Sequence, residues 1–316
     1  MIRRAGRAAC WTCACLAAAW IAAQPVADRW TWSQWIHWLP GWAAAAGAAP
    51  AFLIVRRLAR RGRARTAALA ALGAAAVLGV ARSAVQDVGW RLLPPAVDGT
   101  LAVTHWNARW PGRAALEAGR ALAPELGDVA VLSSPGSMLR ADVACEWVPP
   151  GFRCRDLGMF GIVSRWPVVG ARMLASSPLG ESGTVWIGWF EVELPGGDAL
   201  SILAIDLPSD PWLPRGELAL RLRALLDAAP PPREPDLVVG DLNCTPGSVV
   251  LSSLPRGTAA APPWAATGWL ATYPADFPVL RIDTMRIGPR WEWCDYRTWR
   301  LGVSAHLAQH ARIRAR

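Results

Sequence analysis

Two side chains, Asp241 and Asn243, offer the clearest chemistry in this sequence. They stand at the end of an apolar run that starts after Asp236, and Thr245 and Pro246 interrupt the chain just beyond them. The apolar run predicts a buried strand, and residues two apart on a strand lie on the same face. A carboxylate and an amide are therefore expected to face one space at the rim of a sheet. The same Gly-Asp-x-Asn letters are also typical of an ordinary turn.

Three further polar residues could take part in the same chemistry. Asn107 closes the strand-like segment 101–107, Asp283 lies in an apolar segment, and His306 lies near the C-terminus. Each also has an ordinary explanation. Asn107 can cap the turn before Pro111, Asp283 can pair with a nearby arginine, and His306 can be a surface residue. Their interpretation depends on whether the fold brings them together.

The elements that must position these residues lie between about residue 100 and the C-terminus. The sequence predicts strands at 101–107, 128–132, 160–165, 184–194, 199–205, 236–241 and 280–287, and helices at 113–123 and 213–228. Three consecutive prolines at 230–232 end the second helix, because proline cannot continue a helix. Strands mixed with helices in this proportion predict one layered α/β domain.

The net charge of +9 is confined to the N-terminal region of the 316-residue chain. Residues 1–65 hold ten arginines and one acidic residue, Asp28, whereas residues 66–316 hold 23 arginines and 23 acidic residues. A nucleic-acid-binding protein usually carries its positive charge on the functional domain. The neutral balance after residue 65 therefore makes nucleic acid an improbable partner for this domain.

Three apolar stretches indicate a membrane segment. Residues 8–27 and 36–55 carry no formal charge over 20 residues each, and residues 66–81 form a shorter stretch of 16. A helix needs about 20 residues to cross the hydrocarbon core. The sequence therefore predicts two to three transmembrane helices within residues 1–82, a linker over 83–99, and one domain over 100–316. A secretory signal peptide is the alternative for the first stretch, whereas amphipathic surface helices are disfavoured because the runs lack a polar face.

Arginine placement predicts how this segment is oriented. Arg3, Arg4 and Arg7 precede the first stretch, and six arginines lie within 56–65, whereas the loop 28–35 is rich in tryptophan. The positive-inside rule places the arginine-rich ends in the cytoplasm and the tryptophan-rich loop outside. With three crossings, the domain after residue 82 is extracytoplasmic. With two crossings, it stays in the cytoplasm.

Five segments, in order along the chain, resemble motifs of the endonuclease/exonuclease/phosphatase superfamily, the metal-dependent phosphoesterases related to DNase I. They are residues 104–107, 161–167, 239–246, 280–283 and 304–306. The best of them, 239–246, resembles the family's Gly-Asp-Phe-Asn-x-x-Pro motif. The resemblance covers about residues 99–316. It implies a four-layer α/β sandwich of the DNase I type and Mg²⁺-dependent hydrolysis of a phosphoester.

The resemblance also implies a role for each of the five polar residues. Asp241 would position or deprotonate the attacking water, and Asn243 would help to hold the phosphate. Asn107 would lie beside the metal, so Asn107 and Asp241 are the expected metal-side residues. His306 would contact the phosphate and be oriented by Asp283. Asn107, Asn243 and His306 are thus the expected substrate-binding side chains.

Three positions depart from the family's pattern. Ser134 stands where the resemblance expects the glutamate that is the principal metal ligand, and Ala305 stands where it expects an aspartate. Asp206 takes the place of a histidine. Mg²⁺ prefers anionic oxygen ligands, so the loss of two carboxylates predicts that Mg²⁺ binding is weak or absent. A ligand role for Asp206 would restore one negative charge.

The cysteines say little about function. Cys10, Cys13 and Cys15 lie in the first apolar stretch, where they are expected to behave as small hydrophobic side chains. Cys145 and Cys154 flank a Pro-Pro-Gly turn, so a disulfide can form between them if the domain faces an oxidising compartment.

Together these features predict a membrane-anchored phosphoester hydrolase with an eroded metal site. The neutral domain and the membrane tether favour a lipid head group or another small phosphoester as substrate, with the bilayer itself as a partner. Two alternatives stay open. One is a non-catalytic module that binds a phosphate ligand through Asn243 and His306, and the other is a docking platform for a partner protein.

Overall fold

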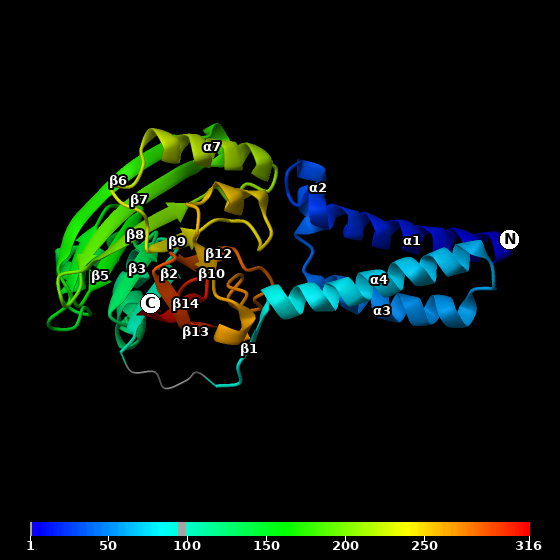
Figure 1. The fold of residues 1–316 in the computed structure, drawn as a ribbon, viewed down its shortest axis with the longest axis horizontal. Coiled ribbons are helices and arrows are strands. Elements are labelled where there is room, and N and C mark those ends of the chain that lie inside the picture. Colours follow the sequence, from blue (N-terminus) through cyan, green and yellow to red (C-terminus); the bar gives the residue numbers. More distant parts are fainter. Residues whose placement is uncertain (1, 94–98) are drawn as a thin grey trace.

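A computed structural model describes residues 2–93 and 99–316, and it shows a helical N-terminal region that projects from an α/β domain (Figure 1). The N-terminal helices are α1 (Ile2–Val26), α2 (Thr31–His37), α3 (Gly41–Leu58) and α4 (Arg63–Gln86). Their alanine-rich faces pack together around Trp20 and Leu72, which are buried. Small side chains allow the long helices to approach closely, so this region has a core of its own.

The apolar stretches form helices with bounds that differ from the expected ones. Ala8–Val26 and Arg63–Gln86 are long and apolar enough to cross a membrane, and α2 with α3 would make a third span with a bend of 73°. The second stretch, expected over 36–55, enters its long helix only at Gly41, because Pro40 precedes it and lacks an amide proton. The third, expected to be short, is lengthened because α4 continues into the flanks on both sides.

The domain is built on two six-stranded sheets. Their strand orders are β10-β12-β9-β8-β7-β6 and β13-β14-β2-β3-β5-β4. The first sheet contains β6 (Val168–Pro178), β7 (Thr184–Glu193), β8 (Ala199–Asp206), β9 (Leu237–Asp241), β10 (Ala259–Ala260) and β12 (Asp283–Ile287). The second contains β2 (Leu101–Asn107), β3 (Val129–Ser133), β4 (Arg153–Asp156), β5 (Phe160–Ser164), β13 (Trp291–Trp299) and β14 (Ala308–Ala315). The expected strands are present, whereas β4, β6, β13 and β14 were not predicted.

Helices cover the outer face of each sheet. They are α5 (Ala115–Leu122) and α6 (Ala141–Ala144) on one side and α7 (Arg215–Ala228) on the other. The loops of the domain also contain short 3-10 helices, which are η1 (Gly112–Ala114), η2 (Ala123–Glu125), η3 (Gly136–Leu139), η4 (Gly180–Ser182), η5 (Val249–Ser253) and η6 (Pro263–Ala265). The central core between the sheets includes Val131, Phe190 and Ile202, all fully buried. Two outer cores lie under α5 and under α7. The result is a four-layer α/β sandwich.

Parallel pairing gathers the polar strand ends at one edge. β2 runs parallel to β3, and β8 runs parallel to β9, so the carboxyl ends of each pair lie side by side. In the antiparallel pair of β9 and β12, Asp241 lies opposite Asp283. Gly240 permits this arrangement, because a Cβ there would lie only 1.7 Å from the carbonyl oxygen of Ile205 on β8. Any other residue at position 240 would push β9 away from β8, the two strands that end in Asp241 and Asp206.

The N-terminal region and the domain are joined by more than the chain between them. Strand β1 (Val88–Trp90) follows α4 directly and pairs with β11 (Thr267–Trp269) of the domain. The segment expected to be a linker, residues 83–99, therefore contains the end of α4 and then strand β1, while its residues 94–98 lie outside the described residues. The backbone N–H of Leu270 also donates to the carbonyl oxygen of Asp87, 2.9 Å away.

The cysteines remain unpaired in this structure. All seven are free thiols, so the bridge between Cys145 and Cys154 considered from the sequence is not formed. Cys145 follows the short helix α6, where its Sγ lies 3.4 Å from the carbonyl oxygen of Asp142. Cys154 belongs to β4. The turn between the two cysteines thus separates a helix from a strand and does not close a regular hairpin.

Candidate functional site

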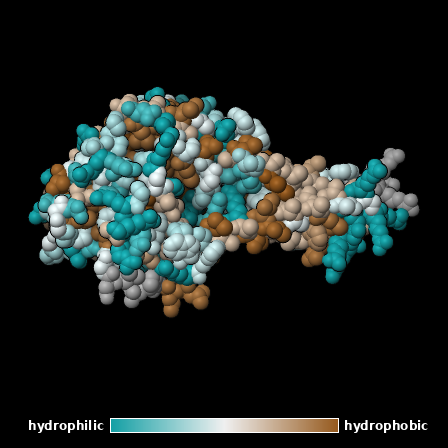
Figure 2. Space-filling view, viewed as in Figure 1, coloured by the Kyte–Doolittle hydropathy of each residue, from teal (hydrophilic) through white to brown (hydrophobic). Residues whose placement is uncertain are grey.

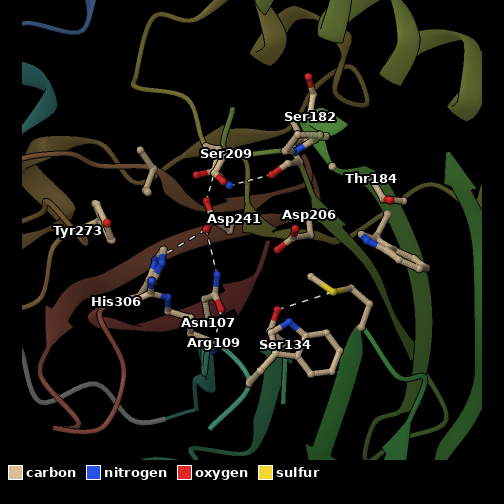
Figure 3. A pocket seen from close by; sticks show the side chains of 18 of the residues that line it. Asn107, Arg109, Ser134, Ser182, Thr184, Asp206, Ser209, Asp241, Tyr273 and His306 are labelled. Carbon is tan, nitrogen blue, oxygen red and sulfur yellow. Dashed lines mark hydrogen bonds and ion pairs between the residues drawn. The ribbon is translucent and has the colours of Figure 1, made fainter. Parts of the chain in front are cut away.

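Polar side chains from both sheets meet at a pocket of about 840 Å³ (Figure 3). Asn107 and Ser134 come from the sheet that contains β2 and β3, whereas Asp206 and Asp241 end β8 and β9 of the other sheet. The wall also includes Trp38 from the N-terminal region. The pocket therefore forms where the two sheets and the α2–α3 connection meet.

Asp241 lies on the pocket floor and is held from two sides. Its Oδ2 accepts a hydrogen bond from Asn107 Nδ2 at 2.9 Å, and its Oδ1 accepts one from the backbone N–H of Asn243 at 2.9 Å. The residue is only 3% exposed. These bonds fix the orientation of the carboxylate and leave it little freedom to turn away from the pocket.

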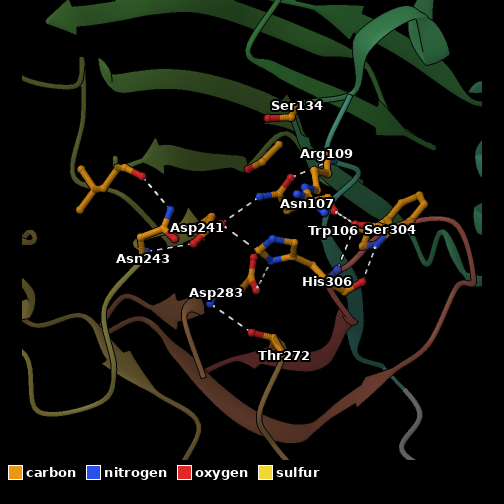
Figure 4. A network of polar contacts seen from close by, with 12 residues as sticks. Trp106, Asn107, Arg109, Ser134, Asp241, Asn243, Thr272, Asp283, Ser304 and His306 are labelled. Atoms are coloured by element: carbon orange, nitrogen blue, oxygen red, sulfur yellow. Dashed lines mark hydrogen bonds and ion pairs between the residues drawn. The ribbon is translucent and has the colours of Figure 1, made fainter. Parts of the chain in front are cut away.

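Asp283 and His306 form a buried pair next to Asp241 (Figure 4). His306 Nδ1 lies 2.9 Å from Asp283 Oδ2 and 3.8 Å from Asp241 Oδ2. The backbone N–H of Asp283 donates to Thr272 Oγ1, and the backbone carbonyl of His306 accepts from Trp106 Nε1. Because a carboxylate can only accept, Nδ1 of His306 carries the proton, and Nε2 is the ring nitrogen left for a ligand.

The charges of this group are strongly coupled. Burial opposes ionisation of Asp283, but the neighbouring His306 holds the pKa of Asp283 below its usual range. Burial alone would lower the pKa of His306, yet the Asp283 carboxylate raises it above its usual value. Burial, and then repulsion from Asp283, raises the pKa of Asp241 to about 7. The site thus holds an imidazole whose protonated form is favoured by Asp283, beside a carboxylate that can bind a proton near neutral pH.

Asn243 is held in an uncommon backbone conformation. Its φ of 45° lies in the left-handed region, which asparagine tolerates better than most residues. Its Nδ2 donates to the carbonyl oxygen of Leu207 at 2.7 Å, while its backbone N–H serves Asp241. The side chain is therefore engaged in holding the β8 and β9 ends together, and its backbone positions the carboxylate.

The three departures from the expected pattern lie in different places. Figure 3 shows Asp206 between Asp241 and Ser134. Burial, together with repulsion from Asp241 and Asp283, raises the pKa of Asp206 well above its usual range. Ser134 lines the pocket, but its Oγ faces Met159 Sδ at 3.7 Å. Ala305, expected beside Ser134, is not among the residues that line the pocket.

Mg²⁺ is the ion that the sequence resemblance implies, and the donor set fits it loosely. Asp206 and Asp241 each present a carboxylate to the pocket, and their mutual repulsion is the kind that a bound cation relieves. Mg²⁺ is commonly held by one or two carboxylates together with waters and substrate phosphates. Asp283 and His306 also lie within 4.8 Å of Asp241, but they are engaged with each other. The residues can hold a divalent ion, although Ser134 offers only a neutral oxygen.

Two arginines of the pocket were not singled out from the sequence. Arg109 lines the pocket and follows Asn107 by two residues, so its proximity could have been inferred from the strand end. Arg215 also lines it but belongs to α7, far away in the sequence. It is fully buried and donates hydrogen bonds to the carbonyl oxygens of Asn243, Asp210 and Leu213. Both add positive charge beside the carboxylates.

Residues of the α1–α3 connection hold Arg215 in place. The Trp38 ring centroid lies 5.0 Å from the Arg215 guanidinium carbon. Gln34 Oε1 accepts from the backbone N–H of Arg215 at 3.2 Å, and Gln34 Nε2 donates to the carbonyl oxygen of Pro211 at 2.7 Å. Asp28, fully buried, accepts from Val249 N–H at 2.9 Å. No sequence pattern signalled these contacts, because they join residues that are about 180 or more positions apart.

The structure brings together all five residues singled out from the sequence. Asn107, Asp241, Asn243 and His306 line the pocket, and Asp283 lies directly behind His306. The ordinary explanations for Asp283 and His306 do not describe their positions, since both are buried within one network. Asn107 does cap its turn, because its Oδ1 accepts from the backbone N–H of Arg109 at 3.0 Å, and its Nδ2 also binds Asp241 within the network. Their roles in a reaction stay predictions.

Known structures share this fold. An endonuclease/exonuclease/phosphatase family protein from Bacteroides thetaiotaomicron matches with a TM-score of 0.52 and 15% identity, over 68% of this chain and 97% of that one. A protein of the same description from Beutenbergia cavernae matches with a TM-score of 0.47 and 18% identity, over 68% and 72%. One from Bacteroides vulgatus gives 0.48 and 14%, over 69% and 99%.

Sequence comparison adds no nearer relative. No family model matches the chain, and no curated protein is similar to it in sequence. At 15% identity, the likeness to the Bacteroides thetaiotaomicron structure establishes the DNase I-like fold and no activity. The expected fold, a four-layer α/β sandwich, is thereby confirmed.

Proposed function

We propose that this protein is a membrane-anchored hydrolase of phosphoesters. The observation that carries the proposal is the joint placement of Asp241 and His306 in one pocket, with Asp283 bound to His306 from behind. Such an arrangement supplies a fixed proton acceptor beside a cationic proton donor. The pocket also holds Arg109, whose charge suits a phosphate.

In the proposed reaction, water attacks the phosphorus atom while Asp241 takes its proton, and the bond from phosphorus to the ester oxygen breaks. His306 stabilises the phosphoryl oxygens and donates its Nε2 proton to the departing alcohol oxygen. Asp241, with a pKa of about 7, accepts a proton from the attacking water near neutral pH. The hydrogen bonds from Asn107 and Asn243 keep its carboxylate in one orientation during that step. His306 faces the phosphoryl oxygens with its imidazolium supported by Asp283, and Arg109 adds a second positive charge.

A divalent ion held by Asp206 and Asp241 would offset negative charge on the phosphoryl group. We propose that such an ion binds weakly, because Ser134 stands where the sequence resemblance expects a glutamate. The metal site would then be eroded in comparison with the family's pattern. Substrate phosphate would contribute a large share of the ligands.

The proposed substrate is a small phosphoester or a lipid head group, and the domain is proposed to lie outside the cytoplasm. The apolar helices α1 and α4 support the membrane location, and the balance of arginine and acidic residues after residue 65 argues against nucleic acid. The arginines between α3 and α4 support an extracytoplasmic domain.

The test uses the full-length protein in lipid nanodiscs with bis(p-nitrophenyl) phosphate and p-nitrophenyl phosphate as substrates, and with Mg²⁺ varied. We expect turnover that Asp241→Ala and His306→Ala reduce by about 100-fold or more, in line with loss of a positioned acid or base. Asp276→Ala is the matched control, since Asp276 is an exposed acid paired with Arg300. Unchanged turnover in both site variants would contradict the proposal.

A second candidate function is a phosphate-binding module without turnover. Ser134 favours it, because a site without a strong metal ligand can retain Arg109 and His306 for binding. Calorimetric titration with inorganic phosphate separates the two functions. Phosphate binding that Arg109→Ala removes, in a protein with no measurable hydrolysis of either substrate, would support the binding module.

A further inference from the structure

Four exposed tryptophans, which we call the tryptophan surface, lie in two ring-contact pairs at the junction of the two regions. This tryptophan surface consists of Trp30, Trp32, Trp35 and Trp212, which are 49%, 59%, 46% and 68% exposed. The rings of Trp30 and Trp32 stack at 6.0 Å, and those of Trp35 and Trp212 meet edge to face at 5.3 Å. Three of these residues belong to the α1–α3 connection, and the fourth belongs to the domain.

The tryptophan surface lies near the domain-side end of a candidate membrane span, which points to the bilayer as its partner. Trp30 lies four residues beyond the end of the candidate span Ala8–Val26. That span of 19 residues is about 28 Å long at ~1.5 Å per residue, close to the thickness of a hydrocarbon core. The opposite end of the helices carries the arginines of residues 56–65, seen as a hydrophilic tip in Figure 2. The tryptophan surface therefore lies at the depth of lipid head groups, where tryptophan is enriched.

The domain contributes Trp212 to this level, and the contact is fixed. The carbonyl oxygen of Pro211, next to Trp212, accepts a hydrogen bond from Gln34 at 2.7 Å. Arg215, four residues from Pro211, has its backbone N–H on the same Gln34 side chain. The loop between β8 and α7 is thus hydrogen-bonded to α2. Trp212 therefore cannot move away from Trp35 unless these bonds break.

The same loop forms part of the pocket mouth. Pro208 and Ser209 line the pocket just before Trp212, and Trp38 lines it from the other side. The rings of Trp35 and Trp38 lie 6.0 Å apart. Aromatic side chains therefore run without interruption from the exposed tryptophan surface to the pocket wall.

We infer that the tryptophan surface is seated in the head-group layer of the bilayer and holds the pocket mouth against it, so that the phosphoester entering the pocket is the head group of a membrane lipid. The choice of lipid as substrate rests on the proposed hydrolase function, whereas the seating of the surface in the bilayer does not. A soluble phosphoester would reach the same residues from water. The two sources can be separated by experiment.

The seating is tested with a photoreactive benzoylphenylalanine introduced at single positions of the full-length chain, in vesicles of phosphatidylcholine and phosphatidylglycerol. We expect lipid adducts at position 212. Leu16 on α1 is the positive control because it is 69% exposed on a candidate span. Val169 is the negative control, because it is 57% exposed at the start of β6, at the sheet edge opposite the pocket. Adducts at position 16 without adducts at position 212 would overturn the inference.

The substrate source is tested with the double variant Trp32→Ala/Trp212→Ala. Both side chains are exposed, so the variant should keep the thermal unfolding midpoint of the natural protein. We expect its hydrolysis of vesicle phospholipid to fall by about tenfold or more, with hydrolysis of bis(p-nitrophenyl) phosphate unchanged. An equal fall on both substrates, or none on either, would overturn the lipid source. Absence of turnover in the natural protein would instead count against the hydrolase, while the adduct experiment still decides the seating.

Discussion

Asp206 and Asp241 are carboxylates that the parallel strands β8 and β9 force into one buried space. Burial raises the pKa of each above the usual aspartate value, and repulsion from Asp241 adds to the rise at Asp206 while repulsion from Asp283 adds to it at Asp241. A raised pKa means that the folded protein resists ionisation of a group that ionises freely in the unfolded chain. The arrangement therefore costs stability at neutral pH and supplies proton-accepting groups in return.

Asp206→Asn should make the protein more stable at high pH. Below the unfolded-state pKa, both states hold the Asp206 proton and the substitution has little effect. As pH rises, the unfolded chain loses this proton first, so the stability of the natural protein falls and the advantage of Asn grows. We expect a thermal midpoint higher than that of the natural protein at pH 8 and nearly equal at pH 3, below the unfolded-state pKa of 3.8, measured in EDTA. Each 1 kcal/mol corresponds to about 2–4 °C for a domain of this size.

The same measurement with added Mg²⁺ provides the control. If Asp206 helps to hold the ion, Mg²⁺ should raise the midpoint of the natural protein more than that of Asp206→Asn. If the thermal midpoint of Asp206→Asn exceeded that of the natural protein by the same amount at both pH values, the electrostatic explanation would be contradicted.

Ser134→Glu should strengthen metal binding. Ser134 lines the pocket, and an added carboxylate there supplies the anionic oxygen that Mg²⁺ prefers. Its φ of 50° is a strain of about 1–3 kcal/mol that the natural serine already carries, so the backbone adds little further loss of stability. Ser134→Gln is the matched control, with the same size and strain but no charge. We expect the Mg²⁺ concentration at half-maximal turnover to fall about tenfold for Glu only, and an equal fall for Gln would refute the charge argument.

At the scale of elements, the α1–α3 connection works as a brace on the loop that precedes α7. Gln34 binds both Pro211 and the first residue of α7, Arg215. Arg215 in turn holds the carbonyl oxygen of Asn243, whose N–H serves Asp241. Each link is a hydrogen bond of 3.2 Å or less between groups that are at least partly buried, so a displacement of α2 is passed to the carboxylate through three contacts.

Gln34→Ala should therefore lower activity without unfolding the domain. The substitution leaves the N–H of Arg215 and the carbonyl oxygen of Pro211 without their partner, a loss of about 1–3 kcal/mol each if they stay buried. We expect faster hydrogen exchange over residues 207–215 and about a 3- to 10-fold slower turnover of bis(p-nitrophenyl) phosphate, given a transmitted loss near 1 kcal/mol.

Gln34→Glu is the matched control for the brace. Glutamate keeps an acceptor for the Arg215 N–H and loses only the donor to Pro211. Its effect on exchange and turnover should lie between those of the natural protein and Gln34→Ala. Unaltered exchange over 207–215 in both variants would show that α2 does not brace the loop.

At the scale of the whole molecule, the two ends of the helical region differ in chemistry. The tip far from the domain is hydrophilic (Figure 2) and carries the arginines of residues 56–65, whereas exposed tryptophans lie in the α1–α3 connection next to the domain. The domain has equal numbers of arginine and acidic residues after residue 65, so charge does not draw it to either membrane face. Orientation is then decided by the arginine-rich tip.

We expect the domain to lie outside the cytoplasm. Alkaline phosphatase fused after residue 95 should be active in a bacterial host, and a fluorescent protein that folds only in the cytoplasm should stay dark at the same position. A fusion after Ala59, between α3 and α4, should give the opposite pair of results, because that connection carries the arginines. Fluorescence of the protein fused after residue 95 would place the domain in the cytoplasm and contradict the proposed orientation.

The sequence by itself determined the strands that end in polar residues and the five residues of the network. Strands such as β8 and β9 are continuous apolar runs because both faces are buried, so their ends are readable. By contrast, β6 was missed because two register shifts and Gly170 interrupt its pattern, and its exposure does not alternate. Local patterns report local burial, and they fail where the pairing is irregular.

Only the tertiary structure decided which residues outside the motifs complete the site. Arg215 and Trp38 meet in the pocket wall although α3, α4 and strands β1 to β8 lie between them in the chain. The tertiary structure likewise decided the protonation behaviour of Asp206, since its pKa is raised by burial and by the closeness of Asp241 and Asp283. Such properties arise from distances between residues far apart in the chain, and neither composition nor spacing encodes those distances directly.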